Sequence, residues 1–137
     1  MAGSLSKTTD IAFSGMKAQT QRLKVISENM ANVDSVSTVK GGDPYQRQMV
    51  TFQNYVDKAT GANLVKVSEV IKDKSDFIIE YAPNHPGADE AGYIKKPNVN
   101  PLIEMMDMKE AQRTYEANLN VVQTAKDMKS GLLDILQ

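Results

Sequence analysis

The only histidine, His85, is the side chain of this sequence best suited to proton transfer or metal binding at neutral pH. It lies in the segment PNHPGADE, where Asp89 and Glu90 follow it within five residues. A zinc site would need more nitrogen or sulfur ligands, and a calcium loop would need a denser, regularly spaced set of oxygens. We therefore interpret His85 as a solvent-facing residue of a turn and predict no metal site.

Glu104 and Asp107 form the second candidate, because their spacing of one helical turn could pair two carboxylates for acid–base chemistry. Both lie in the first turns of a predicted helix, where the helix dipole favours acidic side chains, and we interpret them as surface charges. The sequence contains no phosphate-binding glycine loop, nucleophile elbow or metalloprotease pair. We predict that the chain is not an enzyme and uses no cofactor. A small hydrolase would require His85 and an acidic partner to converge in a pocket.

The composition disfavours several classes of partner. Sixteen basic and 17 acidic residues give a net charge of -1, so there is no electrostatic reason to expect nucleic acid or an anionic membrane surface. The chain has no cysteine, which excludes disulfides and thiolate metal sites. No segment reaches the roughly twenty apolar residues of a membrane span, and the first ten residues lack the apolar core of a secretory signal. We expect no direct membrane insertion.

Two apolar stripes, with residues at alternating four- and three-residue spacing, occupy the two ends of the chain over about four heptads each. Such a pattern favours a long helix that packs along another helix. If the helices form no supercoil, Leu119 fits the second stripe better than Asn118. The predicted interaction residues are Leu5, Ala12, Met16, Leu23, Ile26, Met30 and Val33 in the first stripe, and Met108, Ala111, Tyr115, Leu119, Val122, Ala125, Leu132 and Leu136 in the second.

Helix-breaking residues mark three segments. All five prolines lie between residues 44 and 101, which leaves both ends free to be helical. We expect an N-terminal helix in residues 1–35 that is capped by Ser4 or Ser6, and a C-terminal helix in residues 100–137 that is capped by Asn100, with Pro101 at its first position. Residues 36–99 form the central segment.

Short strands are predicted in the central segment at residues 45–52, 64–71 and 77–81, and residues 72–76 are expected to join the last two strands as a hairpin. Residues 83–92 follow as a loop that is restricted by two prolines. The predicted fold is mainly α with a small β insert, in which the long terminal helices pack as a coiled-coil-like pair. Either stripe could pack against the other within one molecule or against neighbouring molecules, and two helices alone leave much apolar surface uncovered.

Three motifs now point to a family. Residues 14–18 read SGMKA and residues 22–33 read RLKVISENMANV, and this resembles the N-terminal signature of bacterial flagellar rod, hook and hook-associated proteins. YEAN at residues 115–118 resembles their C-terminal signature. The loop YAPNHPGADE at residues 81–90, followed by GY and PNVN, is similar to a proximal rod member of that family. Residues 34–38, DSVST, depart from the Asn-Thr turn and following Gly-Tyr of many relatives.

The resemblance implies a structural subunit of the flagellar basal-body rod, in the periplasm, that is exported from the cytoplasm through the type III export apparatus without a cleaved signal peptide. Its implied partners are other rod proteins, copies of itself, the membrane-ring base and the export apparatus. Family members form helical tubes whose inner layer consists of paired terminal helices. The resemblance therefore implies a subunit of a tube that transmits torque and encloses the export channel. The competing hypothesis is a cytoplasmic adaptor or export chaperone that binds client helices.

Overall fold

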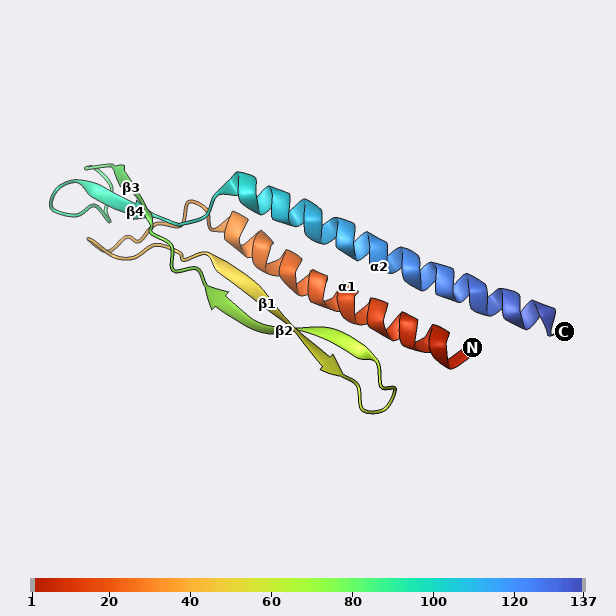
Figure 1. Cartoon of the computed structure of the whole chain (residues 1–137). Coiled ribbons are helices and arrows are strands. Elements are labelled where there is room, and N and C mark those ends of the chain that lie inside the picture. Colours follow the sequence, from red (N-terminus) through yellow and green to blue (C-terminus); the bar gives the residue numbers. More distant parts are fainter. Residues whose placement is uncertain (1, 137) are drawn as a thin grey trace. The chain divides into compact units, whose positions relative to one another are not determined.

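The computed structural model describes residues 2–136, and within them a small β insert lies between two long helices in the chain order (Figure 1). In chain order the elements are α1 (Ala2–Ala31), β1 (Gln48–Val56), β2 (Asn63–Lys72), β3 (Ile78–Tyr81), β4 (Tyr93–Lys96) and α2 (Pro101–Ile135). This architecture confirms the predicted mainly α fold with long terminal helices. None of the helices described here is long and apolar enough to span a membrane.

Helix α2 begins where the sequence predicts. The Asn100 side-chain oxygen accepts a hydrogen bond from the Leu102 amide at 3.0 Å, and Pro101 occupies the first helical position. The predicted cap of α1 is wrong, because α1 already begins at Ala2. Ser4 lies inside the helix, where its carbonyl accepts a hydrogen bond from the Thr8 hydroxyl at 3.0 Å. A serine can cap a helix only where its own backbone is not helical, and here α1 already includes the residues that precede Ser4.

The strand pairing differs from the prediction. β2 pairs with β1, and β3 pairs with β4 in an antiparallel register that places Ile78 opposite Lys96 and Tyr81 opposite Tyr93. The predicted hairpin between residues 64–71 and 77–81 is therefore wrong, and β4 was not predicted. The loop of residues 83–92 closes the β3–β4 hairpin instead, with a hydrogen bond of 2.9 Å from the Ala82 amide to the Gly92 carbonyl. Gly92 has a φ of 85°, which a glycine adopts without strain.

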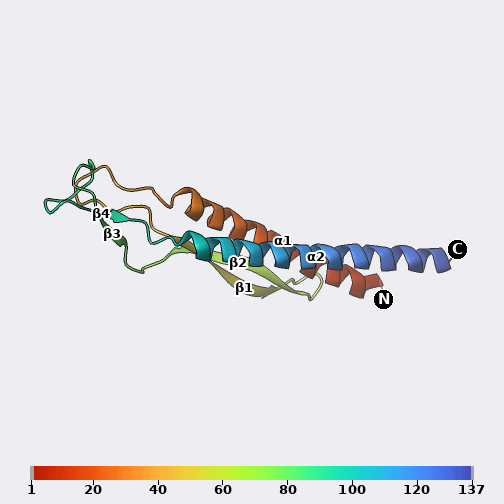
Figure 2. The ribbon, with the colours of Figure 1, turned by 90° about the horizontal axis from the view of Figure 1, so that it is seen from above.

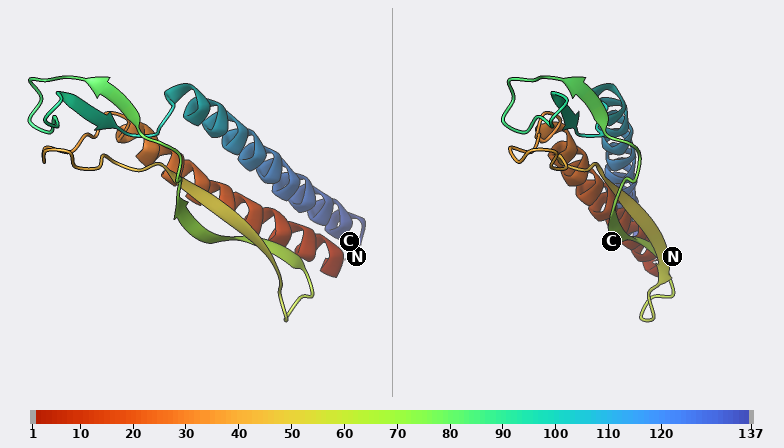
Figure 3. Two further views of the ribbon diagram at one scale, coloured as in Figure 1. Left: turned by 60° about the vertical axis from the view of Figure 1, so that its left-hand side comes forward. Right: turned by 90° about the vertical axis from the view of Figure 1, so that its left-hand side faces the viewer.

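The chain divides into two compact units, and both helices and the β1–β2 hairpin contribute to each of them. The first unit contains residues 1–23, 50–69 and 109–137. Within it, the early part of α1 runs antiparallel to the later part of α2, and the β1–β2 hairpin lies along α1 (Figures 2 and 3). The Ser14 hydroxyl accepts a hydrogen bond of 3.2 Å from the Val65 amide, which joins the hairpin to the helix. Residues 1 and 137, the outermost residues of the predicted terminal segments, lie outside the described residues.

The second unit contains residues 24–49 and 70–108. Its buried apolar side chains include Ile94 on β4 and Val99 just before α2. The rings of Tyr81 and Tyr93 meet edge to face with their centroids 5.2 Å apart. Gly87 brings its loop against the segment that follows α1, because a Cβ atom at Gly87 would lie 1.9 Å from the Ser37 carbonyl oxygen.

A Gly87→Ala substitution is therefore expected to destabilise the chain. The new methyl group meets backbone, which cannot rotate away, so we expect a loss of about 1–3 kcal/mol in the free energy of unfolding. Urea denaturation followed by circular dichroism measures it. Gly3→Ala is the control, because a Cβ atom there has open space around it and should leave the midpoint unchanged or raise it. Equal midpoints for the two variants would contradict this reading of the loop contact.

Candidate assembly surface

The first predicted stripe lies on the protected side of α1. Ala12, Met16 and Ile26 are buried, and the remaining predicted positions of this stripe are half-buried: Leu5, Leu23, Met30 and Val33. The neighbouring positions Phe13 and Lys17 are exposed. Much of this stripe is therefore shielded from water within the chain itself, and its part in contacts between molecules stays a prediction.

The second stripe is protected less evenly. Ala111 and Ala125 are buried, whereas Met108, Tyr115, Val122 and Leu132 are half-buried. Leu119 and Leu136 are exposed. Asn118 takes the inward place that the straight-helix alternative gave to Leu119, because it faces Gly15, where a Cβ atom would come within 2.6 Å of the Asn118 amide nitrogen. A glycine at this point allows the two helices to approach closely, and a short polar side chain fills the space.

Much of the apolar surface of α2 is exposed in the described part of the chain. Met105, Met106 and Met128, which the sequence places beside the second stripe, are all about half exposed or more, and so are Leu102, Leu133 and Ile135. Monomeric proteins scatter single apolar residues over their surface but rarely gather so many on one helix. This exposed surface, more than the protected stripes, is what remains available to another molecule.

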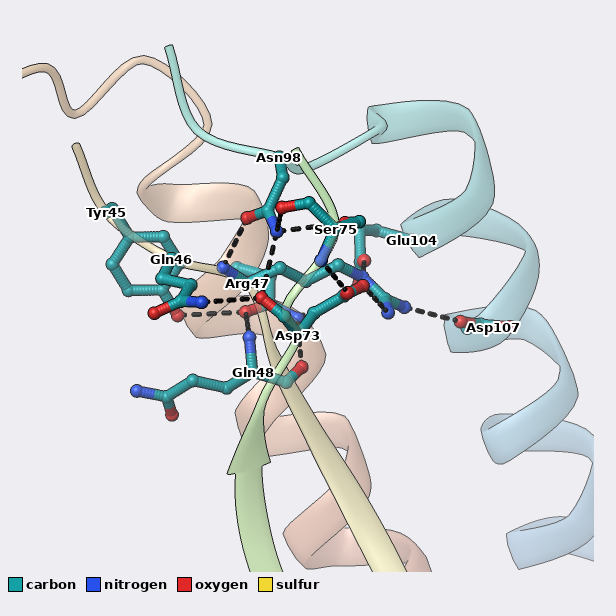
Figure 4. A network of polar contacts seen from close by, with 10 residues as sticks. Tyr45, Gln46, Arg47, Gln48, Asp73, Ser75, Asn98, Glu104 and Asp107 are labelled. Atoms are coloured by element: carbon teal, nitrogen blue, oxygen red, sulfur yellow. Dashed lines mark hydrogen bonds and ion pairs between the residues drawn. The ribbon is translucent and has the colours of Figure 1, made fainter. Parts of the chain in front are cut away.

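A polar network in the second unit is centred on Arg47, at the entrance to β1 (Figure 4). Its guanidinium donates to Glu104 on α2 and lies 3.3 Å from an Asp73 carboxylate oxygen and 3.4 Å from an Asp107 carboxylate oxygen. Glu104 is fully buried, and Arg47 and Asp73 are mostly shielded from water. Arginine suits this position because its planar fork can satisfy several carboxylates at once.

Asn29, on α1, completes the network from the other side. Its amide nitrogen donates to the Gln48 carbonyl at 2.8 Å and to Glu104 at 3.2 Å. Its oxygen accepts from the Tyr45 hydroxyl at 2.8 Å and from the Gln48 amide at 2.9 Å. Asn29 is almost completely buried, so these four bonds use its full hydrogen-bonding capacity. The network thus joins α1, β1 and α2 through groups that would be unfavourable to bury alone.

The surroundings of these groups shift their proton affinities. Burial, followed by the charges of Glu28 and Glu104, raises the pKa of Tyr45 above its ordinary value. Burial alone would lower the pKa of Arg47, but hydrogen bonds and charge from Glu104 and Asp73 raise it. A hydrogen bond from the Ser75 amide, opposed by partial burial and aided by the Ser75 hydroxyl and by Arg47, lowers the pKa of Asp73.

This lowered pKa predicts a loss of stability in acid. A carboxyl group whose pKa is lower in the folded state stabilises the fold above its unfolded pKa, about 3.9 for Asp, and that stabilisation is lost as the pH falls through the folded pKa. We expect the urea midpoint to fall steeply below about pH 4. An Asp73→Asn variant should show a shallower fall over the same range. Parallel acid profiles for the two proteins would contradict the assignment.

Several of these residues were missed or misassigned from the sequence. Glu104 was predicted to be a surface charge, and this is wrong, because the side chain is buried against Arg47 and Asn29. Asp107, which was assigned with it, is half-buried beside the same arginine. The helix dipole explains an acidic residue in a first turn but does not reveal its burial. Local sequence could not reveal it either, since Arg47 lies 57 residues from Glu104.

His85 lies in a turn, as predicted. Its amide donates to the Ala82 carbonyl at 3.0 Å, and its Nδ1 accepts a hydrogen bond from the Gly87 amide at 3.0 Å. The side chain is half-buried rather than fully solvent-facing. Among residues 2–136 there is no group of three or more histidine, cysteine or carboxylate side chains arranged to hold a metal ion.

Comparisons with known proteins agree with this architecture. A family profile described as flagella basal body rod protein matches residues 10–37, and one described as flagellar basal body rod FlgEFG protein C-terminal matches residues 90–135. The flagellar basal-body rod protein FlgC of Agrobacterium fabrum is 45% identical over 97% of this chain and 96% of its own length. FlgC of Borreliella burgdorferi is 38% identical over 97% and 98%, and FlgC of Bacillus subtilis is 36% identical over 92% and 94%. The similarity covers both helices and the insert between them, and the chain therefore belongs to the FlgC family of flagellar basal-body rod proteins.

Proposed function

We infer that this chain is a structural subunit of the flagellar basal-body rod and that its terminal helices supply the contacts between subunits. Family membership over nearly the whole chain is the observation that carries this conclusion. It also disfavours the cytoplasmic adaptor or export chaperone, since the relatives are named as rod proteins. For the same reason we assign the chain a structural rather than an enzymatic role.

In the proposed assembly, residues 1–35 and 100–137 form the inner part of a helical tube around the export channel, and residues 36–99 face outer neighbours. The apolar surface that stays exposed on α2 supports this arrangement, because an isolated pair of helices leaves it in water. The partners would be other rod proteins, copies of this chain and the membrane-ring base. Delivery would occur through the export apparatus, without cleavage of a signal peptide, to the periplasmic rod.

A substitution in the second stripe tests the role of the helices. Val122 is half-buried on α2, and Val122→Asp should block incorporation into rods, because contacts along this stripe would then enclose an unpaired charge. The measurements are swimming in soft agar and the amount of this chain in isolated basal bodies, in cells that lack their own copy. Gln123→Asp, at the exposed neighbouring position, is the control and should retain both.

Normal swimming and normal rods with Val122→Asp would reject the assignment of this stripe.

Limited proteolysis of the dilute purified chain separates a rod subunit from a cytoplasmic adaptor or export chaperone. A rod subunit should be monomeric with cleavable terminal segments before assembly, whereas an adaptor with a preformed groove should be a dimer whose ends resist protease. The second result would favour the adaptor.

A further inference from the structure

The loop of residues 83–92, which joins β3 to β4 (Figure 1), docks on the segment that follows α1. Both belong to the second unit. The Gly41 amide donates a hydrogen bond of 3.3 Å to the Gly87 carbonyl, and a Cβ atom at Gly87 would lie 1.9 Å from the Ser37 carbonyl oxygen. Gly87 is buried. The position of Gly87 therefore decides whether the loop can stay docked.

The His85 side chain fixes Gly87. Its Nδ1 accepts a hydrogen bond of 3.0 Å from the Gly87 amide, two residues further along the chain. The backbone of His85 holds the same turn, because its amide donates to the Ala82 carbonyl and its carbonyl accepts from the Ala88 amide, both at 3.0 Å. Pro86, between His85 and Gly87, has no amide hydrogen to contribute. Because Gly87 is buried, its amide depends on the acceptor that the His85 ring supplies.

This bond requires the neutral form of the imidazole. A neutral ring has one nitrogen that donates and one that accepts, so here Nδ1 accepts and the proton lies on Nε2. In an imidazolium both nitrogens are donors, and an N–H group on Nδ1 would face the N–H group of Gly87. Histidine ordinarily changes its charge between about pH 5 and 8, and His85 is the only histidine of the chain. A fall in pH through this range therefore removes the bond that fixes Gly87.

Other titratable side chains lie on the docked segments and at the adjoining strand ends: Lys40, Asp43, Tyr81, Asp89, Glu90 and Tyr93. Asp43 pairs with Lys95 at 3.0 Å, and Asp89 accepts hydrogen bonds from two backbone amides that follow it. Aspartate, glutamate, lysine and tyrosine side chains ordinarily keep their charge state between about pH 5.5 and 7.5. A response of the loop within that window therefore reports the imidazole of His85.

We propose that His85 is an acid-sensitive latch: the neutral imidazole holds residues 83–92 against residues 37–42, and protonation of the ring releases them. The released loop binds one proton more than the docked loop, so docking strengthens as the pH rises and weakens as the pH falls through the histidine range. The inference goes beyond the proposed function and does not depend on it, because both sides of the latch lie within one chain. In the proposed assembly, where residues 36–99 face outer neighbours, the latch makes the shape of this outer segment sensitive to pH.

Amide hydrogen exchange of the purified full chain, followed by NMR at about pH 7.5 and 5.5, tests the latch. The Gly87 and Gly41 amides report docking, since Gly87 donates to the His85 ring and Gly41 donates to the Gly87 carbonyl. After correction for the intrinsic exchange rate at each pH, their protection should fall by about tenfold at the lower pH, because one proton then favours the open loop. The Ala82 amide, which donates to the Gly92 carbonyl at 2.9 Å, is the internal reference and should keep its protection.

Two variants assign the effect to the ring. His85→Asn keeps an acceptor for the amide two residues further on, as in an Asx-turn, but has no titratable group, so the protection of Gly87 and Gly41 should be the same at both pH values. His85→Ala removes the acceptor and should give the weakened protection at both.

Three results would overturn the proposal: equal protection of the wild type at both pH values, a His85→Asn protein that responds to pH like the wild type, or a His85→Ala protein that stays fully protected. An equal loss of protection at Ala82 would overturn it too, because the acid would then unfold the hairpin as a whole and not release the loop alone.

Discussion

Replacing Arg47 with methionine is expected to lower the free energy of unfolding by about 3–5 kcal/mol, the usual effect of removing one partner of a buried ion pair. The variant leaves Glu104 fully buried with the Asn29 amide as its remaining donor among the described residues, and it removes the positive charge beside Asp73 and Asp107. Urea denaturation at pH 7 measures the loss. A domain of this size has about 5–15 kcal/mol of stability in total, so much of it should disappear.

Two further variants test whether the loss of stability in Arg47→Met comes from the burial of its partners rather than from the loss of an ion pair in general. Lys95 pairs with Asp43 at 3.0 Å, and their side chains are 41 and 72% exposed, so Lys95→Met should change stability by less than about 1 kcal/mol. Adding Glu104→Leu to Arg47→Met removes the stranded carboxylate and should recover a large part of the loss. If Arg47→Met and Lys95→Met proved equally mild, the network would not be a principal source of stability.

Ile26→Asp is expected to have the other large effect. Ile26 is only 4% exposed on α1, so the substitution removes apolar contacts and places a charge where none of the described contacts compensates it. We expect a loss of about 4 kcal/mol or more in the free energy of unfolding, and a failure to restore swimming in cells that lack this subunit.

The matched control is Ile11→Asp, the same exchange on the same helix at a position that is 44% exposed. It should unfold at nearly the same urea concentration as the wild type, since the carboxylate there can remain hydrated. Its effect on swimming then reports contacts between molecules, because the fold is preserved. A stable Ile26→Asp protein that swims normally would show that this face of α1 is neither a core nor an assembly surface.

Elements whose causes are local could be predicted from the amino-acid sequence. Alternating spacing of apolar residues predicted both long helices, since that pattern depends only on helical periodicity. Asn100 and Pro101 located the start of α2 because a cap acts on its own first turn. The terminal signatures and the loop around His85 indicate the rod family from the sequence alone, and the comparisons confirm it.

Features that depend on residues far apart in the sequence could be identified only in the folded chain. Glu104 reads as an ordinary first-turn acid until Arg47 and Asn29 are placed beside it. β2 could have paired with either neighbouring strand, and Asn118 faces inward because Gly15 lies across from it on another helix. Burial and pairing are properties of contacts between segments that are far apart in the chain. Periodicity identifies a face that must be covered, and only the folded arrangement shows what covers it.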